Sequence, residues 1–130
     1  MIVVDASVIL EVLLRTAEAA TIDRRLLDPN ETLHAPHLLD VEVAQVMRRY
    51  VVRGELAAAR GREALALLGT FPIARYPHQP LLARMWDLRE NLTAYDAAYI
   101  ALTEALDGVL LTRDKRLGRS AGHSAAVEVI

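Results

Sequence analysis

Short apolar runs alternate with longer stretches of helical periodicity from one end of the chain to the other. Five of these runs are too short for helices and are limited by turn residues, so they predict strands, at residues 2–4, 32–36, 73–75, 109–111 and 127–130. The stretches between them repeat apolar residues at helical spacing and predict helices, at residues 7–14, 17–27, 37–53, 55–69, 79–91, 93–106 and 115–119. Ser7 is placed to cap the first of these helices.

The predicted strands carry apolar residues on both faces. Residues 2–4 and 109–111 contain no polar side chain and show no alternation of period two. Such strands, when they alternate with helices along the chain, are typical of a parallel sheet that is covered on both sides. We therefore expect one α/β domain over residues 1–130, with three layers (α/β/α) and a central parallel sheet of about five short strands.

The composition is that of a globular protein, with 53% hydrophobic and 25% charged residues. There is no cysteine, so disulfides and thiolate zinc sites are excluded. Glu11 interrupts the only apolar stretch near the start, so we expect neither a secretory signal nor a membrane span, and a cytoplasmic protein. The formal net charge of −2 argues against nucleic-acid binding by bulk charge but is compatible with a local basic patch.

Two of the predicted strands lead into an aspartate. Asp5 directly follows residues 2–4, and Asp114 lies just beyond residues 109–111. In an open parallel sheet the functional crevice lies outside the carboxyl ends of the strands, where the strand order reverses. The two carboxylates therefore converge if their strands are neighbours. Each aspartate alone also fits a helix cap, and Thr112 fits either a turn or a hydrogen-bond donor to a carboxylate.

Two further acids are candidates for the same site. Glu42 lies among apolar residues in the first turns of a predicted helix, and Asp96 lies near the start of a helix with few polar positions. An acid in such surroundings is unfavourable unless a cation or a donor meets it. Each also has an ordinary interpretation, as a first-turn glutamate favoured by the helix dipole or as part of a Thr93-x-x-Asp96 capping box. Asp40 points elsewhere around its helix and fits a plain surface acid.

The four candidate acids together indicate a type of metal. They come from distant segments, in a chain with no cysteine and no histidine pair at ligand spacing, and this pattern suits a hard cation such as Mg²⁺ or Mn²⁺. A carboxylate cluster that holds such ions is one way to hydrolyse a phosphodiester, because the metal activates water and neutralises charge on the phosphate. We expect surface or turn positions for the histidines, which are His34, His37, His78 and His123.

Four segments of the chain are similar to those of a known family: "MIVVDASVILEVLL", "APHLLDVEVAQVMRR", "LTAYDAAYIALTEAL" and "GVLLTRDKRL". In order and spacing they resemble the signature segments of the PIN-domain nucleases, and among these most of all the VapC toxins of toxin–antitoxin pairs. The resemblance covers essentially the whole chain, and the third and fourth segments are specific in combination. Gln45 stands where the family often has Asn, and Thr103 where Ala is common; neither departure affects the acids.

This resemblance implies a PIN-like fold and a Mg²⁺-dependent endoribonuclease in which Mn²⁺ can substitute. The family's acidic residues, which bind the metal and catalyse the reaction, fall on Asp5, Glu42, Asp96 and Asp114. The family's hydroxyl residue two positions before the last acid falls on Thr112, and its small hydroxyl residue after the first acid falls on Ser7. The resemblance also implies an RNA substrate, a homodimer and a cognate VapB antitoxin that blocks the site. The number of ions and the identity of the general base stay open.

Basic residues near the acids are candidates for binding the substrate phosphates. Arg113 and Arg116 flank Asp114 and are the best placed, and Ser7 is a further candidate for substrate contact. For the other basic residues a solvated helix surface is the more ordinary interpretation; they are Arg48, Arg49, Arg53, Lys115 and Arg119.

Other functional classes fit the chain less well. A phosphatase of the haloacid-dehalogenase type needs Asp-x-Asp after its first strand, where this chain has Asp5, Ala6 and Ser7. A receiver domain needs a phosphoacceptor aspartate in mid-chain and a later lysine after a strand. A non-catalytic PIN-like binding module would normally have lost an acid, and metal-dependent RNA cleavage would distinguish it. A PIN nuclease of RNA maturation or surveillance stays open, and a small antitoxin reading frame upstream would argue against it.

Overall fold

The computed structural model of the protein describes residues 1–130. Five parallel strands form one sheet in the order β3-β2-β1-β4-β5. Their bounds are β1 (Ile2–Val4), β2 (Leu33–Pro36), β3 (Ile73–Tyr76), β4 (Val109–Thr112) and β5 (Ala126–Val129). The chain builds the sheet outward from β1 to one edge and then returns to the other side of β1, so the strand order reverses between β1 and β4. The predicted parallel sheet of five short strands is confirmed.

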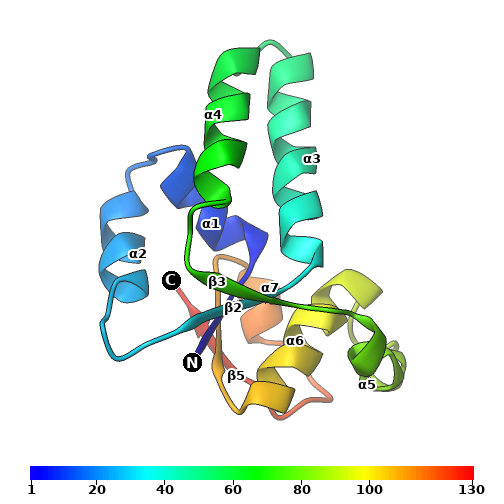
Figure 1. The fold of residues 1–130 in the computed structure, drawn as a ribbon. Helices are drawn as coiled ribbons and strands as arrows, with labels where there is room; N and C mark the ends of the chain where they lie inside the picture. Colours follow the sequence, from blue (N-terminus) through cyan, green and yellow to red (C-terminus); the bar gives the residue numbers. More distant parts are fainter.

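The helices follow the strands along the chain and lie on both sides of the sheet (Figure 1). Their bounds are α1 (Ala6–Leu13), α2 (Ala19–Leu26), α3 (Leu38–Val52), α4 (Ala58–Leu68), the 3₁₀ turn η1 (Gln79–Leu81), α5 (Leu82–Asp87), α6 (Ala94–Leu106) and α7 (Lys115–Gly118). The prediction of one helix over residues 79–91 was wrong. Pro80 lies in the tight η1 turn, α5 ends at Asp87, and Leu88, the C-cap of α5, is buried. No helix has the length and apolar character that crossing a bilayer requires.

Two cores lie on opposite faces of the sheet. In β1, Ile2 and Val4 face the core formed with α1, α2, α3 and α4, whereas Val3 faces the core formed with α5, α6 and α7. This alternation explains why β1 has no polar position, because a strand with helices on both sides must bury every side chain. Figure 1 shows α3 and α4 extending side by side away from the sheet, while α6 lies across the opposite face.

His34 was expected at the surface or in a turn, and this expectation was wrong. It lies in β2, paired in register with Val3, and its side chain is 8% exposed. The hydroxyl oxygens of Thr32 and Tyr76 each lie 2.7 Å from one of its ring nitrogens. These two partners satisfy the ring inside the sheet, and burial lowers the pKa of His34.

Candidate active site

The reversal of strand order brings the predicted acids to one edge of the sheet. Val4 pairs with Leu111, so Asp5, directly after β1, lies next to the end of β4, beyond which Asp114 follows. Helix α3 starts after β2 and carries Glu42, and α6 packs against β1 and β4 and carries Asp96. The Glu42 carboxylate lies within electrostatic range of the carboxylates of Asp5 and Asp96, and the Asp96 carboxylate lies within range of that of Asp114.

Asp5 is held by three hydrogen bonds. Its Oδ1 accepts from the Ser7 hydroxyl at 2.6 Å and from the Val8 backbone N–H at 3.2 Å, and its Oδ2 accepts from the Thr112 hydroxyl. Asp5 is therefore the N-cap of α1 and a member of the acidic site at once. The prediction that Ser7 caps this helix was wrong, because Ser7 lies inside the first turn. Burial raises the pKa of Asp5, and the hydrogen bonds from Ser7 and Thr112 oppose that rise.

The segment after β4 is tied to Asp5 through two hydroxyl groups. Thr112 is fully buried, and its Oγ1 also accepts from the Asp114 backbone N–H at 3.0 Å. The Ser7 Oγ accepts from the Arg113 backbone N–H at 2.9 Å. Each hydroxyl thus donates to the Asp5 carboxylate and accepts from the chain that leads to Asp114. Protein atoms on both sides engage the Ser7 hydroxyl, so its role in this geometry is to position Asp5.

Glu42 has a partner that was not expected from the sequence. The Tyr99 hydroxyl donates to Glu42 Oε1 at 2.6 Å, and Tyr99 is only 2% exposed. Burial raises the pKa of Glu42, the Tyr99 hydrogen bond opposes that rise, and the charges of Asp5 and Asp96 add to it. A signal for Tyr99 was present in the sequence, because it lies three residues after Asp96 and so shares a helical face with it.

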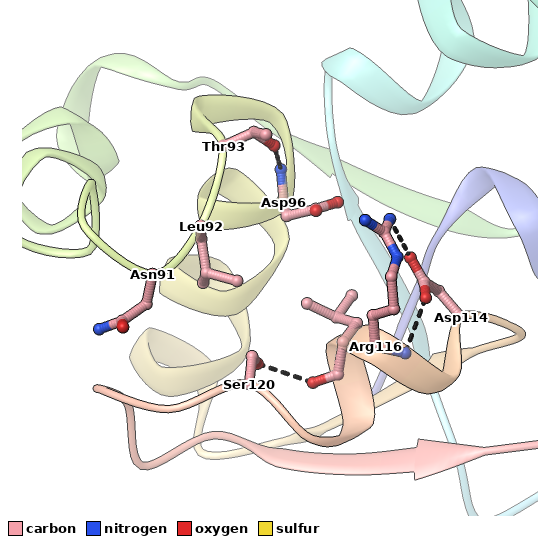
Figure 2. Close-up of a pocket in the computed structure, with 8 residues that line it drawn as sticks. Asn91, Leu92, Thr93, Asp96, Asp114, Arg116 and Ser120 are labelled. Atoms are coloured by element: carbon pink, nitrogen blue, oxygen red, sulfur yellow. Dashed lines mark hydrogen bonds and ion pairs between the residues drawn. The ribbon is translucent and has the colours of Figure 1, made fainter.

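Asp96 and Asp114 line one pocket together with Arg116 (Figure 2). The Thr93 hydroxyl accepts from the Asp96 backbone N–H at 3.2 Å and caps α6. Burial raises the pKa of Asp96, and the charge of Asp114 adds to the effect. Asp114 caps α7, and the ion pair with the Arg116 guanidinium at 2.8 Å holds the pKa of Asp114 below its usual range.

The two arginines that were expected to bind phosphate have different partners in the structure. Arg116 lies at the acids, but the Arg113 guanidinium donates to the Ile130 carbonyl at 2.7 Å and approaches Glu11 at 3.6 Å. Arg49 lines a groove together with Glu42 and with residues of α1. As expected of a surface acid, Asp40 is occupied elsewhere, in a two-point ion pair with Arg75 at 2.7 and 2.9 Å.

The donors of the site fit a hard cation by their chemistry. Asp96 lines the pocket that it shares with Asp114, and Glu42 Oε2 and one lone pair of Asp5 Oδ2 accept no hydrogen bond. Burial disfavours the charged forms of all three groups, so a positive charge among them would be stabilising. No three carboxylate or imidazole groups lie close enough in this structure to form a metal site. A Mg²⁺ ion here would therefore be held by one or two of these carboxylates together with water molecules.

A family model of the PIN domain matches residues 2–122. The chain therefore belongs to the PIN-domain family. In this protein the parallel sheet presents its carboxylates at the carboxyl ends of the neighbouring strands β1 and β4. Ribonuclease VapC9 of Mycobacterium tuberculosis is 44% identical over 130 residues, which are 100% of this chain and 98% of the relative. Ribonuclease VapC12 of the same species is 40% identical over 130 residues, 100% and 99% of the two chains. Within the PIN-domain family, the chain is a member of the VapC group.

The fold is also shared with a solved toxin–antitoxin structure. The crystal structure of VapBC2 from Rickettsia felis, bound to a DNA fragment from its promoter, contains a chain that superposes with a TM-score of 0.74. The match covers 100% of this chain and 99% of that chain at 14% sequence identity. At this level of identity the likeness shows the common fold.

Proposed function

We propose that this protein is a Mg²⁺- or Mn²⁺-dependent endoribonuclease and the toxin of a VapBC-type pair. The observation that carries the proposal is the convergence of Asp5, Glu42, Asp96 and Asp114 at the point where the strand order reverses. Ribonucleases VapC9 and VapC12, which match the chain from end to end, support the choice of RNA as the substrate.

Each residue of the site has a role in this proposal. A bound Mg²⁺ or Mn²⁺ would activate water and offset charge on the phosphate and the leaving oxygen. Asp5 and Asp96 would hold the ion, with Glu42 and Asp114 in direct or water-mediated contact. Thr112 keeps the Asp5 carboxylate in place through its buried hydroxyl. In-line attack of water on phosphorus would leave a 5′-phosphate and a 3′-hydroxyl on the RNA products.

Cleavage of total RNA by the purified protein tests the proposal. We expect discrete cuts with Mg²⁺ or Mn²⁺, none in EDTA, and none by the Asp5→Asn and Asp96→Asn variants. Asp40→Asn is the matched control, because Asp40 lies on α3 near Glu42 but pairs with Arg75, and it should cleave normally. Full activity of both site variants would refute the assignment of the acids, and activity in EDTA would refute the metal.

The toxin role needs a test in cells. Expression of the protein should arrest growth, the Asp5→Asn variant should not, and co-expression of a VapB-type antitoxin from a neighbouring reading frame should restore growth. The complex of VapB and VapC chains in the Rickettsia felis structure supports such a partner. Normal growth combined with RNA cleavage in vitro would point instead to a role in RNA maturation or surveillance. We also propose a homodimer, which the mass in solution by light scattering would test.

A further inference from the structure

Arg116 is the basic residue that the structure places between the acids. Its guanidinium lies 2.8 Å from Asp114 Oδ2, and its backbone N–H donates to Asp114 Oδ1 at 2.8 Å. Figure 2 shows the guanidinium between the carboxylates of Asp96 and Asp114, in the pocket that all three residues line. A positive group thus stands where two carboxylates from α6 and the β4–α7 turn face each other.

The backbone of Arg116 is fixed by a helix cap, whereas its side chain is exposed and has one ion pair. The backbone N–H is part of the cap of α7, so the base of the side chain is fixed at the edge of the site. The side chain itself is 86% exposed, and the Asp114 ion pair is its single salt bridge. Exposed ion pairs of this kind contribute little to stability. The guanidinium can therefore leave Asp114 at small cost while remaining within reach of the pocket.

We propose that Arg116 is an internal counter-ion, which neutralises the side of the acidic site formed by Asp96 and Asp114 and is displaced when a divalent cation binds to the site. The displaced guanidinium then binds a phosphate of the RNA. Carboxylate and phosphate present similar pairs of oxygens to the planar fork of arginine, so one side chain serves both partners. The inference rests on the proposed function, because it requires a metal and an RNA substrate at this site.

The proposal predicts opposite effects of one substitution on the two ligands. Arg116→Gln removes the competing cation and should tighten Mn²⁺ binding by about three- to tenfold at low ionic strength, the scale of one charge acting on a divalent ion across solvent. The same variant should raise KM for RNA at saturating Mn²⁺, because a phosphate contact is lost. If Arg116 served only to bind phosphate, the Arg116→Gln substitution would raise KM and leave the Mn²⁺ affinity unchanged.

Lys115→Gln is the matched control for charge. Lys115 directly follows Asp114, is exposed and forms no ion pair, so this change removes the same charge beside the same acid. Calorimetric titration of Mn²⁺ into the wild-type protein and both variants would compare their affinities, with melting temperatures to establish folding. We expect less than about a twofold change for Lys115→Gln.

Two results would overturn the role of Arg116. One is an unchanged or weaker Mn²⁺ affinity in Arg116→Gln; the other is an equal gain in Lys115→Gln, which would assign the effect to net charge. A wild-type protein that neither binds Mn²⁺ nor cleaves RNA would instead reject the proposed function itself. The two failures are thus distinguishable in the same set of measurements.

Discussion

Replacing Thr112 with valine would show how much the buried hydroxyl contributes to the site. Thr112 is 0% exposed, donates to Asp5 Oδ2 and accepts from the Asp114 N–H at 3.0 Å. Valine has nearly the same shape, so the change removes two hydrogen bonds and little packing. A hydrogen bond to a charged group contributes about 1.5–3 kcal/mol and a neutral one about 1 kcal/mol. We expect the free energy of unfolding at neutral pH to fall by about 3 kcal/mol.

Thr112→Ser is the control, because it keeps the hydroxyl and removes one methyl group, at a cost of about 1 kcal/mol. Urea unfolding in EDTA, followed by circular dichroism, would compare the variants. The lost hydrogen bond favoured the Asp5 carboxylate and opposed the rise of its pKa. The hydrogen bond therefore stabilises the protein above the Asp5 pKa, and this stabilisation is lost as the pH falls through that pKa. The difference in free energy of unfolding between the wild type and Thr112→Val should accordingly become smaller as the pH is lowered toward about 4. Equal midpoints for valine and serine, or a deficit independent of pH, would refute this reasoning.

Three further predictions follow from single contacts. Glu42→Gln should raise the melting temperature in EDTA at neutral pH, because burial and neighbouring charges raise the pKa of Glu42 and disfavour its carboxylate; the gain should vanish below about pH 4, and a lower melting temperature would contradict it. Tyr99→Phe removes the 2.6 Å hydrogen bond to Glu42 and should weaken Mn²⁺ binding about tenfold in calorimetry, whereas unchanged affinity would deny Tyr99 a positioning role. Gly108→Ala would place a Cβ 2.9 Å from the Met1 carbonyl oxygen, so urea unfolding should show a loss of about 1–3 kcal/mol with RNA cleavage retained.

The sequence determined the strands and the acids because both depend on local pattern. Residues 2–4 and 109–111 are apolar throughout and too short for helices, and they became β1 and part of β4. An acid directly after such a strand lies at its carboxyl end whatever the rest of the fold does. The candidate positions of Asp5 and Asp114 therefore followed from the strand pattern. Glu42 and Asp96 were candidates from their apolar surroundings, and the resemblance to a family assigned all four acids to one site.

The partners of these acids were decided by the tertiary structure. The sequence places Arg113 and Arg116 on either side of Asp114, yet the Arg113 guanidinium reaches the Ile130 carbonyl and the Arg116 guanidinium pairs with Asp114. Long, flexible side chains take their direction from elements that pack nearby, and local sequence does not encode these. The helix expected over residues 79–91 is interrupted in the structure, where Pro80 lies in the η1 turn and the buried Leu88 caps the C-terminus of α5.

For Tyr99, the sequence pattern indicates burial but does not identify the hydrogen-bond partner. Tyr99 lies on a helix with few polar positions, a pattern typical of a covered helix, and its side chain is buried. Periodicity reports that a helical face is covered, but not which side chain covers it. Only the packing of α6 against the sheet, next to α3, brought the Tyr99 hydroxyl to Glu42. Sequence pattern thus determined which residues lie inside and at the strand ends, while the meeting of distant segments determined which of their atoms bond.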